Sequence, residues 1–497
     1  MIKQLLLSVL RSVFMCINTL RVSSRFNQIN DGDKKILVII TPWRLSPVPY
    51  FTMIIAKLLQ AKGGRVEVFL SKYGYPDSKI NSRVEFFFIR ICLRILKLNI
   101  ANYKKLDSVE INSGQLNNIN DVAKNTAIWL KRGEQNVNIK DIDEVADQIS
   151  KFYVEFKSLA FDVNSYDKVF YGGGVTGPTG IILKSLLTDH AKVSTFDSAP
   201  GKCIITSVNG AACKLHDLPI VFNKYKILLE DEGVKQRLID LASDEIESRF
   251  NGNDRFCYQN SKHKYEGDEI DILFPLNSSW DASALGTHKI FSSSSDWLLS
   301  SIKYVVENHN VAKIVVRQHP AERYSWQKSS DNIEKLLSEY INSNKVVFVK
   351  ADDDISSYDL LKKTSLVVYG NSTIGLESLI QNIPVLSAAN SYHNVMTGHY
   401  ISSKEEYFTK LDFLLNNIKV KKTVDKQSVA EASLLYVLGQ KCNWVDTLYG
   451  LSNWRAWPKL GGKLSNEDNI YSFVDSILTG VPFCDKQLSK IVGKAND

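Results

Sequence analysis

Short runs of branched aliphatic residues, each followed by a loop and a helical stretch, recur in two parts of this chain. In the first part, residues 35–41 (KILVIIT) precede the helical stretch 51–64 (FTMIIAKLLQAKGG), and residues 65–70 (RVEVFL) form the next expected strand. Continuous apolar runs of this length are typical of strands that a parallel sheet buries on both faces. The alternation of strand and helix therefore predicts an α/β fold with parallel sheets.

The same alternation returns further along the chain. Residues 80–165 are mainly helical in pattern and predict an insertion or cap, whereas residues 169–171 and 225–233 (YKILLEDEG) predict further strands. The polar, turn-rich stretch 250–268 is the expected linker, and a second series of strands and helices occupies residues 271–390. Two α/β halves of similar size predict a ligand cleft between them, at the carboxyl ends of the strands.

These patterns divide the chain into four expected parts. They are a basic amphipathic segment (1–30), an N-terminal α/β domain (31–262) with a helical insertion (about 80–165), a C-terminal α/β domain (263–410) and a C-terminal helical tail (411–497).

The composition agrees with a folded protein and excludes several classes. A chain of 497 residues suggests two domains, and 44% hydrophobic with 23% charged residues excludes disorder and coiled coil. The net charge of +7, from 61 basic and 54 acidic residues, suits an anionic ligand or membrane surface but predicts no nucleic-acid partner. The seven cysteines include no C-x-x-C pair, which predicts free thiols in a reducing cytoplasm.

Residues 1–30 carry basic residues and no acidic one. Apolar residues recur at helical spacing, and Arg11 interrupts what would otherwise be the core of a signal peptide. The chain contains no uninterrupted run of 18 or more apolar residues, so the sequence does not predict an ordinary transmembrane helix. Two interpretations stay open, namely a basic helix lying on an anionic membrane and a helix packed on its own protein.

The most informative motif is SLVVYGNSTIGLES, residues 365–378. A buried strand is followed by three side chains suited to capping a helix that starts near Gly375, and such a helix start favours an anion. Gly375 would let the backbone approach a phosphate, and Glu377 could accept hydrogen bonds from ribose hydroxyls. The alternative is a capped helix without a ligand. The three capping candidates are Asn371, Ser372 and Thr373.

A second motif, AKIVVRQHPAE at residues 312–322, places Arg317, His319 and Pro320 at the end of an expected strand. A histidine at such a strand end can donate to a phosphate oxygen, and its ordinary pKa allows partial protonation. Pro320 would fix the turn that aims the ring. Taken alone, the motif also fits a histidine in an ordinary turn.

A third motif, KILLEDEGVKQ at residues 226–236, clusters Glu230, Asp231 and Glu232. Neighbouring carboxylates raise one another's pKa, which suits a general base. The alternative is a solvated acidic start of the next helix.

Weaker candidates lie near the first strands. Trp43 and Arg44 follow the first expected strand, and Gly173 and Gly174 follow residues 169–171, so these four could line the acceptor side of the cleft.

Together, Asp231-Glu232-Gly233, His319-Pro320 and Ser372-Thr373 resemble, in order and approximate separation, the motifs of bacterial CMP-sugar transferases, which include sialyltransferases and polysialyltransferases. Residues 371–387, with FPLNSSWD upstream, are similar to capsule-synthesis proteins that include Kdo transferases. The resemblance covers about residues 225–390.

The resemblance implies a GT-B architecture, in which two Rossmann-like domains face each other across a cleft. It makes residues 31–262 the acceptor domain and residues 263–410 the nucleotide-sugar-binding domain. It implies transfer of a CMP-activated ulosonic acid, of the sialic acid or Kdo type, onto a capsule or lipopolysaccharide acceptor. It makes Asp231 the catalytic base or key acid, with Glu232 as the alternative. It also implies that His319, Ser372 and Thr373 bind the phosphate of CMP. The Asn371 before the Ser-Thr pair and the third acid Glu230 depart from the pattern and leave open which carboxylate acts.

The expected partners are a nucleotide-sugar donor and a glycan or glycolipid acceptor, in the cytoplasm or at the inner face of the bacterial membrane. Backbone N–H groups, His319 and Arg317 could stabilise the departing phosphate, so neither a metal nor a cofactor is expected. A UDP- or GDP-sugar donor, an epimerase and a non-catalytic subunit of a polysaccharide assembly complex are the alternatives.

Overall fold

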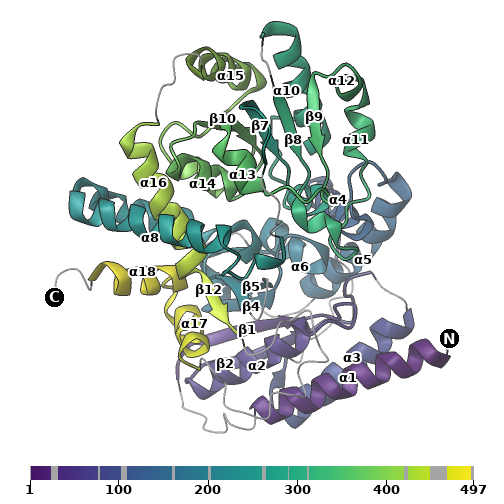
Figure 1. The fold of residues 1–497 in the computed structure, drawn as a ribbon. Coiled ribbons are helices and arrows are strands. Elements are labelled where there is room, and N and C mark those ends of the chain that lie inside the picture. Colours follow the sequence, from purple (N-terminus) through teal and green to yellow (C-terminus); the bar gives the residue numbers. More distant parts are fainter. Residues whose placement is uncertain are drawn as a thin grey trace. The chain divides into compact units, whose positions relative to one another are not determined.

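The fold of the chain comprises two compact units (Figure 1). The computed structural model describes residues 2–23, 32–76, 79–101, 109–158, 163–187, 189–199, 203–259, 265–288, 290–310, 313–418, 424–447 and 467–493. Within these residues, unit 1 is drawn from Met1–Ala127, Asn138–Asp217 and Cys442–Lys490, and unit 2 from Ile128–Val137, Leu218–Lys441 and Ile491–Asp497. Each unit is therefore assembled from segments that are distant in sequence.

The described part of unit 1 contains a seven-stranded sheet in the order β12-β6-β5-β4-β1-β2-β3. The pairs from β5 to β3 are parallel, and β6 pairs antiparallel with both β5 and β12. The strands are β1 (Lys35–Ile40), β2 (Arg65–Leu70), β3 (Asn99–Ile100), β4 (Lys168–Gly172), β5 (Val193–Ser198), β6 (Cys203–Ser207) and β12 (Trp444–Asp446).

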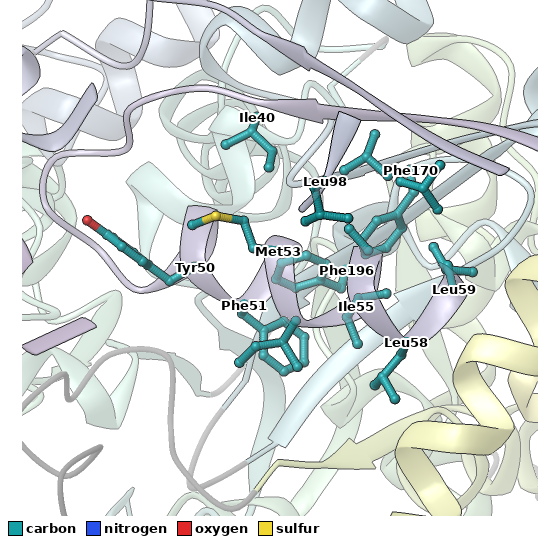
Figure 2. Close-up of a cluster of buried hydrophobic side chains, with 14 of the residues drawn as sticks. Ile40, Tyr50, Phe51, Met53, Ile55, Leu58, Leu59, Leu98, Phe170 and Phe196 are labelled. Atoms are coloured by element: carbon teal, nitrogen blue, oxygen red, sulfur yellow. The ribbon is translucent and has the colours of Figure 1, made fainter. Parts of the chain in front are cut away.

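Helices cover both faces of this sheet. On one face, Phe51 of α2 packs with Phe196 of β5, their ring centroids 5.0 Å apart, in the apolar cluster of Figure 2. On the other face, Phe69 of β2 meets Phe156 of α5 at 5.1 Å. The helices lying wholly or mostly in unit 1 are α1 (Ile2–Ser23), α2 (Val48–Ala61), α3 (Lys79–Ile95), α4 (Ser113–Lys131), α5 (Ile139–Lys157), α6 (Gly177–Ile181), α17 (Glu467–Thr479) and α18 (Phe483–Gly493).

The described part of unit 2 contains a five-stranded sheet, entirely parallel, in the order β11-β10-β7-β8-β9. This order brings the carboxyl ends of β7, β8, β9 and β10 to one edge, where α/β folds build ligand sites. The strands are β7 (Ile270–Pro275), β8 (Ile314–Arg317), β9 (Val346–Val349), β10 (Thr364–Tyr369) and β11 (Val385–Ser387).

The helices of unit 2 bury the two faces of its sheet. Trp297 of α10 and Tyr407 of α15 pack with Phe274 and Val368 on one face, and α14 packs against α16. The helices are α7 (Asp217–Tyr225), α8 (Glu232–Phe250), α9 (Ser279–Ala284), α10 (Ser294–Asn308), α11 (Ile333–Leu336), α12 (Ser338–Asn342), α13 (Ser357–Lys362), α14 (Ile374–Ile380), α15 (Lys404–Ile418) and α16 (Lys426–Val437).

The expected fold class is confirmed, since both units are α/β with mainly parallel sheets. The expected strands at 35–41, 65–70 and 169–171 correspond to β1, β2 and β4. All seven cysteines lie in the described ranges, and all are free thiols.

The expected strand at 225–233 is wrong. These residues form the end of α7, a 3₁₀ turn (Lys226–Glu230) and the start of α8. A short apolar run does not distinguish a strand from a helical turn, and here Ile227 is exposed whereas Leu229 is buried.

The expected boundary at 262/263 is also wrong, because residues 218–262 belong to unit 2. Helix α8 packs against α16 in that unit. Within the expected linker 250–268, Asp254 is ion-paired with Arg249 at 2.9 Å, so the described part of this stretch is ordered structure of unit 2.

The tail expected at 411–497 is divided between the units. Helices α15 and α16 complete unit 2, and Cys442–Lys490 returns to unit 1, where Val445 pairs with Ile204. Phe473 of α17 is fully buried in the core of unit 1.

The helical insertion expected at about 80–165 is also divided between the units. Residues 128–137 belong to unit 2, where the Asp331 carboxylate accepts hydrogen bonds from the Glu134 and Gln135 N–H groups.

Candidate functional site

A cavity of about 170 Å³ opens at the carboxyl ends of β7, β8, β9 and β10 in unit 2. It combines polar side chains with two guanidinium groups. Pockets that enclose a whole drug-sized ligand have at least about 300 Å³, so this cavity is suited to part of a larger molecule. Its lining residues are Arg249, Phe256, Gln259, Pro275, Leu276, Arg317, His319, Pro320, Ser356, Ser357, Tyr358, Ser372, Thr373, Ile374, Glu377 and Gln440.

The cavity brings together two motifs that the sequence placed on separate strands. His319 and Pro320 follow β8, and Ser372 and Thr373 follow β10. Strand β7 lies between β8 and β10 in the sheet and contributes Pro275 at its own carboxyl end. The parallel order of these three strands is therefore the reason that the two motifs converge.

His319 lines the cavity as a neutral imidazole. Its Nδ1 accepts a hydrogen bond from the Ala321 N–H at 3.2 Å and so caps the 3₁₀ turn Pro320–Arg323. Burial, helped by the positive charge of Arg317, lowers the pKa of His319 to about 4. At neutral pH the remaining ring proton is therefore on Nε2, which acts as a hydrogen-bond donor. The partial protonation expected from the sequence does not apply.

Arg317 has structural contacts of its own at the cavity wall. Its side chain is 1% exposed, and its guanidinium donates to the Lys350 carbonyl, to the Ile355 carbonyl at 3.0 Å and to Ser357 Oγ at 3.4 Å. Burial lowers its pKa to about 10, so it remains charged at neutral pH. Arg317 therefore holds the loop after β9 in place and adds positive charge beside the cavity.

The segment between β10 and α14 differs in detail from the expected cap. The helix begins at Ile374, and at its N-cap, Thr373, the described structure has no side-chain capping bond. The Ser372 and Thr373 side chains line the cavity instead. Asn371 lines a different, smaller cavity of about 30 Å³.

Gly375 is required for packing inside unit 2. A Cβ atom at this position would lie 2.1 Å from the ring of Tyr369. The Tyr369 hydroxyl is in turn hydrogen-bonded to Nδ1 of the buried His393 at 2.8 Å. Close contact with an aromatic ring, rather than approach to a phosphate, is thus what this structure demands of Gly375.

Glu377 forms a buried ion pair at the base of the cavity. Its carboxylate accepts hydrogen bonds from Arg249 at 2.6 Å and from the Tyr436 hydroxyl at 3.1 Å, and only 2% of the residue is exposed. Arg249 also donates to Asp254 and Gln440. Burial favours neutral Arg249, but Glu377 and Asp254 outweigh this and raise the pKa of Arg249 well above its usual value.

The acidic motif lies outside this cavity. Asp231 is the N-cap of α8, where its Oδ1 accepts a hydrogen bond from the Val234 N–H at 3.0 Å. Glu230, Asp231 and Glu232 are all exposed. Among the described lining residues, Glu377 is the only carboxylate. The position of the motif therefore agrees with the alternative of a solvated helix start, and its catalytic role stays a prediction.

Three of the four acceptor-side candidates lie together in unit 1. The rings of Trp43 and Tyr75 are in contact, tilted by 37° with centroids 4.0 Å apart, and a Cβ on Gly173 would lie 2.5 Å from the Trp43 ring. Gly174 follows with φ of +116°, a conformation that favours glycine. Arg44 is exposed, with φ of +52°. The group lies at the carboxyl ends of β1 and β4.

The sequence motifs did not identify several lining residues. Arg249 and Gln440 come from the ends of helices that pack around the sheet, so no strand-end pattern marks them. Ser356, Ser357 and Tyr358 follow β9, so the carboxyl end of this strand could have identified them as candidates.

A larger cavity in unit 2, of about 740 Å³, is lined by His399, Lys410 and Asp425 among others. It lies near the amino end of β10 and contains none of the predicted site residues. The carboxyl-end cavity is therefore the better candidate.

Residues 229–398 match the family model for capsule polysaccharide biosynthesis proteins. This segment contains every residue that lines the carboxyl-end cavity except Gln440. No curated protein sequence matches the chain significantly.

Among solved structures, the chain is similar to two Kdo transferases of KpsC from Thermosulfurimonas dismutans. The beta Kdo 2,7 transferase is 13% identical over 60% of this chain and 88% of that chain, with a TM-score of 0.30. The beta Kdo 2,4 transferase is 11% identical over 54% and 79%, with a TM-score of 0.32. A UDP-GlcNAc 2-epimerase from Methanocaldococcus jannaschii is 12% identical over 82% and 99%, with a TM-score of 0.25. These likenesses are too distant to carry an argument about activity.

Proposed function

We propose that this chain is a glycosyltransferase of capsule polysaccharide synthesis that binds a nucleotide-sugar donor in the carboxyl-end cavity of unit 2. The observation that carries the proposal is the convergence of His319, Ser372 and Thr373 in one cavity. The family match of residues 229–398, which covers nearly the whole lining, supports the same assignment.

The cavity supplies what a departing nucleotide phosphate needs. A neutral His319 with its proton on Nε2 can donate to a phosphate oxygen, and the Ser372 and Thr373 hydroxyls can donate to others. The buried charge of Arg317 lies beside them. Donors fixed in a partly buried site stabilise developing negative charge without reorganisation. Loss of any one is expected to lower kcat by about 100-fold or more.

The proposed donor is a CMP-activated ulosonic acid of the Kdo type, and the proposed acceptor is a capsule glycan or glycolipid. The motif order supports a CMP-sugar over a UDP- or GDP-sugar. The group around Trp43 and Gly173 in unit 1 is the proposed acceptor surface. We propose that the transfer is metal-independent, which requires full activity in the presence of EDTA.

Asp231, with Glu232 as the alternative, remains the proposed base for the acceptor hydroxyl. Asparagine caps a helix about as well as aspartate, so Asp231→Asn should leave the free energy of unfolding unchanged. If Asp231 is the base, this variant loses about 100-fold or more in transfer rate. Full activity of both Asp231→Asn and Glu232→Gln would remove the acidic motif from the mechanism.

Nucleotide binding tests the proposal. The melting temperature of the full-length protein is measured with CMP, UDP and GDP, for the native chain, for His319→Ala and for the control His309→Ala, whose ring contacts Asp412 away from the cavity. We expect CMP to stabilise the native chain and the control but not His319→Ala. Stabilisation by UDP or GDP alone would show that the donor carries that nucleotide instead of CMP. Equal stabilisation of His319→Ala by CMP would contradict the assigned site.

A further inference from the structure

Helix α1 has its apolar side exposed, the reverse of a helix that packs on a protein core. Its side chains Leu6, Leu10 and Phe14 are 57%, 50% and 40% exposed. Among the described residues, 17 large hydrophobic side chains are exposed, and eight of these lie on α1 and α3. The eight are Leu5, Leu6, Leu7, Leu10, Phe14, Ile17, Phe87 and Ile95.

The side of α1 that packs on unit 1 consists mainly of small and polar side chains, together with the buried Met15 and Val22. Ser8 Oγ donates to Asn81 Oδ1 of α3 at 2.6 Å, and Cys16 Sγ donates to the Phe88 carbonyl at 3.3 Å. Ser12 and Thr19, on the same side of α1, are fully buried. Figure 1 shows α1 and α3 lying side by side. Because the polar side faces the protein, the leucine-rich side faces outward.

The charge of the same two helices is almost entirely positive. Helices α1 and α3 contain seven basic residues (Lys3, Arg11, Arg21, Lys79, Arg83, Arg90 and Arg94) and one acidic residue, Glu85. The surplus, seven minus one, accounts for six of the seven net positive charges of the whole chain. Glu85 is fully buried, where its carboxylate accepts the Trp43 and Leu45 N–H groups. Arg83, Arg90 and Arg94 are exposed along α3.

We propose that α1 and α3 form a docking surface for an anionic lipid bilayer, with α1 lying in the plane of the interface. We call this surface the basic apolar face and define it by Leu6, Leu7, Leu10, Phe14, Ile17, Arg83, Arg90 and Arg94. Apolar side chains that enter the acyl boundary and basic ones that meet anionic headgroups are the two contributions that hold a helix at an interface. The surface places the enzyme where a lipid-linked acceptor would be, but its binding does not depend on the proposed transferase activity.

An in-plane position accounts for the structure better than a membrane span. Leu5–Ser23 has the length and mean hydropathy (1.6) of a span, and 39% of it is buried in the protein. A spanning α1 would have to leave α3 and expose the Ser8–Asn81 and Cys16–Phe88 contacts. It would also place Arg11 near the bilayer centre, which is costly.

Vesicle flotation with the full-length protein tests this surface. The vesicles are phosphatidylcholine alone or with about one third phosphatidylglycerol, at low and high salt. Two double variants probe the surface, Leu6→Ser with Leu10→Ser and Arg90→Gln with Arg94→Gln. Their controls alter equally exposed residues elsewhere, Ile139→Ser with Phe413→Ser and Lys124→Gln with Lys345→Gln.

The native chain and both controls should bind the anionic vesicles, and salt should weaken this binding. Each surface variant should lose about tenfold or more in apparent affinity. No binding to anionic vesicles, or equal binding by surface variants and controls, would overturn the proposal. Self-association that Leu6→Ser with Leu10→Ser abolishes, without vesicle binding, would assign the face to a second copy. Recovery of the native chain only by detergent, and not by salt, would show a span.

Discussion

His319 shows what a residue's position in sequence does and does not reveal. The strand-end pattern placed it correctly beside a cavity, because the carboxyl ends of parallel strands meet at one edge. Its charge state could not be read from the sequence, since burial and Arg317 set the pKa. The ion pair of Glu377 could not be predicted either, because its partner Arg249 is remote in sequence.

One buried and four half-buried histidines predict a loss of stability in acid. Burial lowers the pKa of His216, His288, His319 and His399 to about 4 and that of His393 to about 3. The unfolded chain takes up these protons near pH 6.5, whereas the folded chain does not. The contribution of these histidines to the free energy of unfolding should therefore fall as the pH drops from about 6.5 to about 4, whereas carboxyl groups whose pKa burial raises, such as Glu322, contribute in the opposite direction.

Urea unfolding at several pH values measures this slope. His319→Asn, which can keep the cap on the Ala321 N–H, should make the slope shallower by about one proton. A slope that His319→Asn leaves unchanged would contradict the assignment of a neutral His319.

The buried Arg249–Glu377 ion pair predicts that removing one of its charges strongly destabilises the protein. Glu377→Gln leaves the buried guanidinium with less compensating charge and should cost about 3 kcal/mol or more. The control, Lys441→Met, breaks the more exposed Lys441–Glu245 pair and should cost less than about 1 kcal/mol. Chemical denaturation measures both. Equal, small losses would show that the Arg249 pair is solvated rather than buried.

At the scale of elements, the strands with long β-branched runs were predictable and the short ones were not. β1 and β2 are each six residues long and mainly apolar, although β2 includes Arg65 and Glu67, whereas β12 has three residues and its pairing with β6 joins distant parts of the chain. The run KILLE became a 3₁₀ turn because Asp231 caps the helix that follows. Local pattern alone does not decide between these outcomes.

The start of α14 predicts a packing effect at Gly375. Gly375→Ala would place a Cβ 2.1 Å from the Tyr369 ring and should destabilise the protein by about 1–3 kcal/mol without any nucleotide. Gly493→Ala in α18, where nothing lies within 4 Å of the new Cβ, is the matched control and should not destabilise. Thermal unfolding without ligand measures the difference. An unchanged melting temperature for Gly375→Ala would indicate that the glycine serves the ligand instead.

At the scale of the whole molecule, each unit is discontinuous in sequence. The sequence predicted two halves correctly, but it placed 411–497 in a tail because a helical pattern does not reveal which core a helix joins. The structure likewise shows where the positive surplus lies, since α1 and α3 together account for six of the seven net positive charges.

The return of the chain to unit 1 predicts that part of the expected tail is core. Phe473→Ala removes a fully buried ring that packs near Phe170 and should cost about 3–5 kcal/mol. Val481→Ala, at a residue 39% exposed just beyond α17, should cost much less. Urea unfolding of both variants measures these losses in the free energy of unfolding. A loss below about 1 kcal/mol for Phe473→Ala would mean that this segment is a tail after all.

The central claim is that one phosphate of the donor is held by His319 together with the Ser372–Thr373 pair. A crystal structure of the full-length protein with CMP tests it most directly. We predict the phosphate in the carboxyl-end cavity, within hydrogen-bond distance of His319 Nε2 and of the Ser372 or Thr373 hydroxyl. CMP bound elsewhere, or a phosphate that contacts neither motif, would contradict the account.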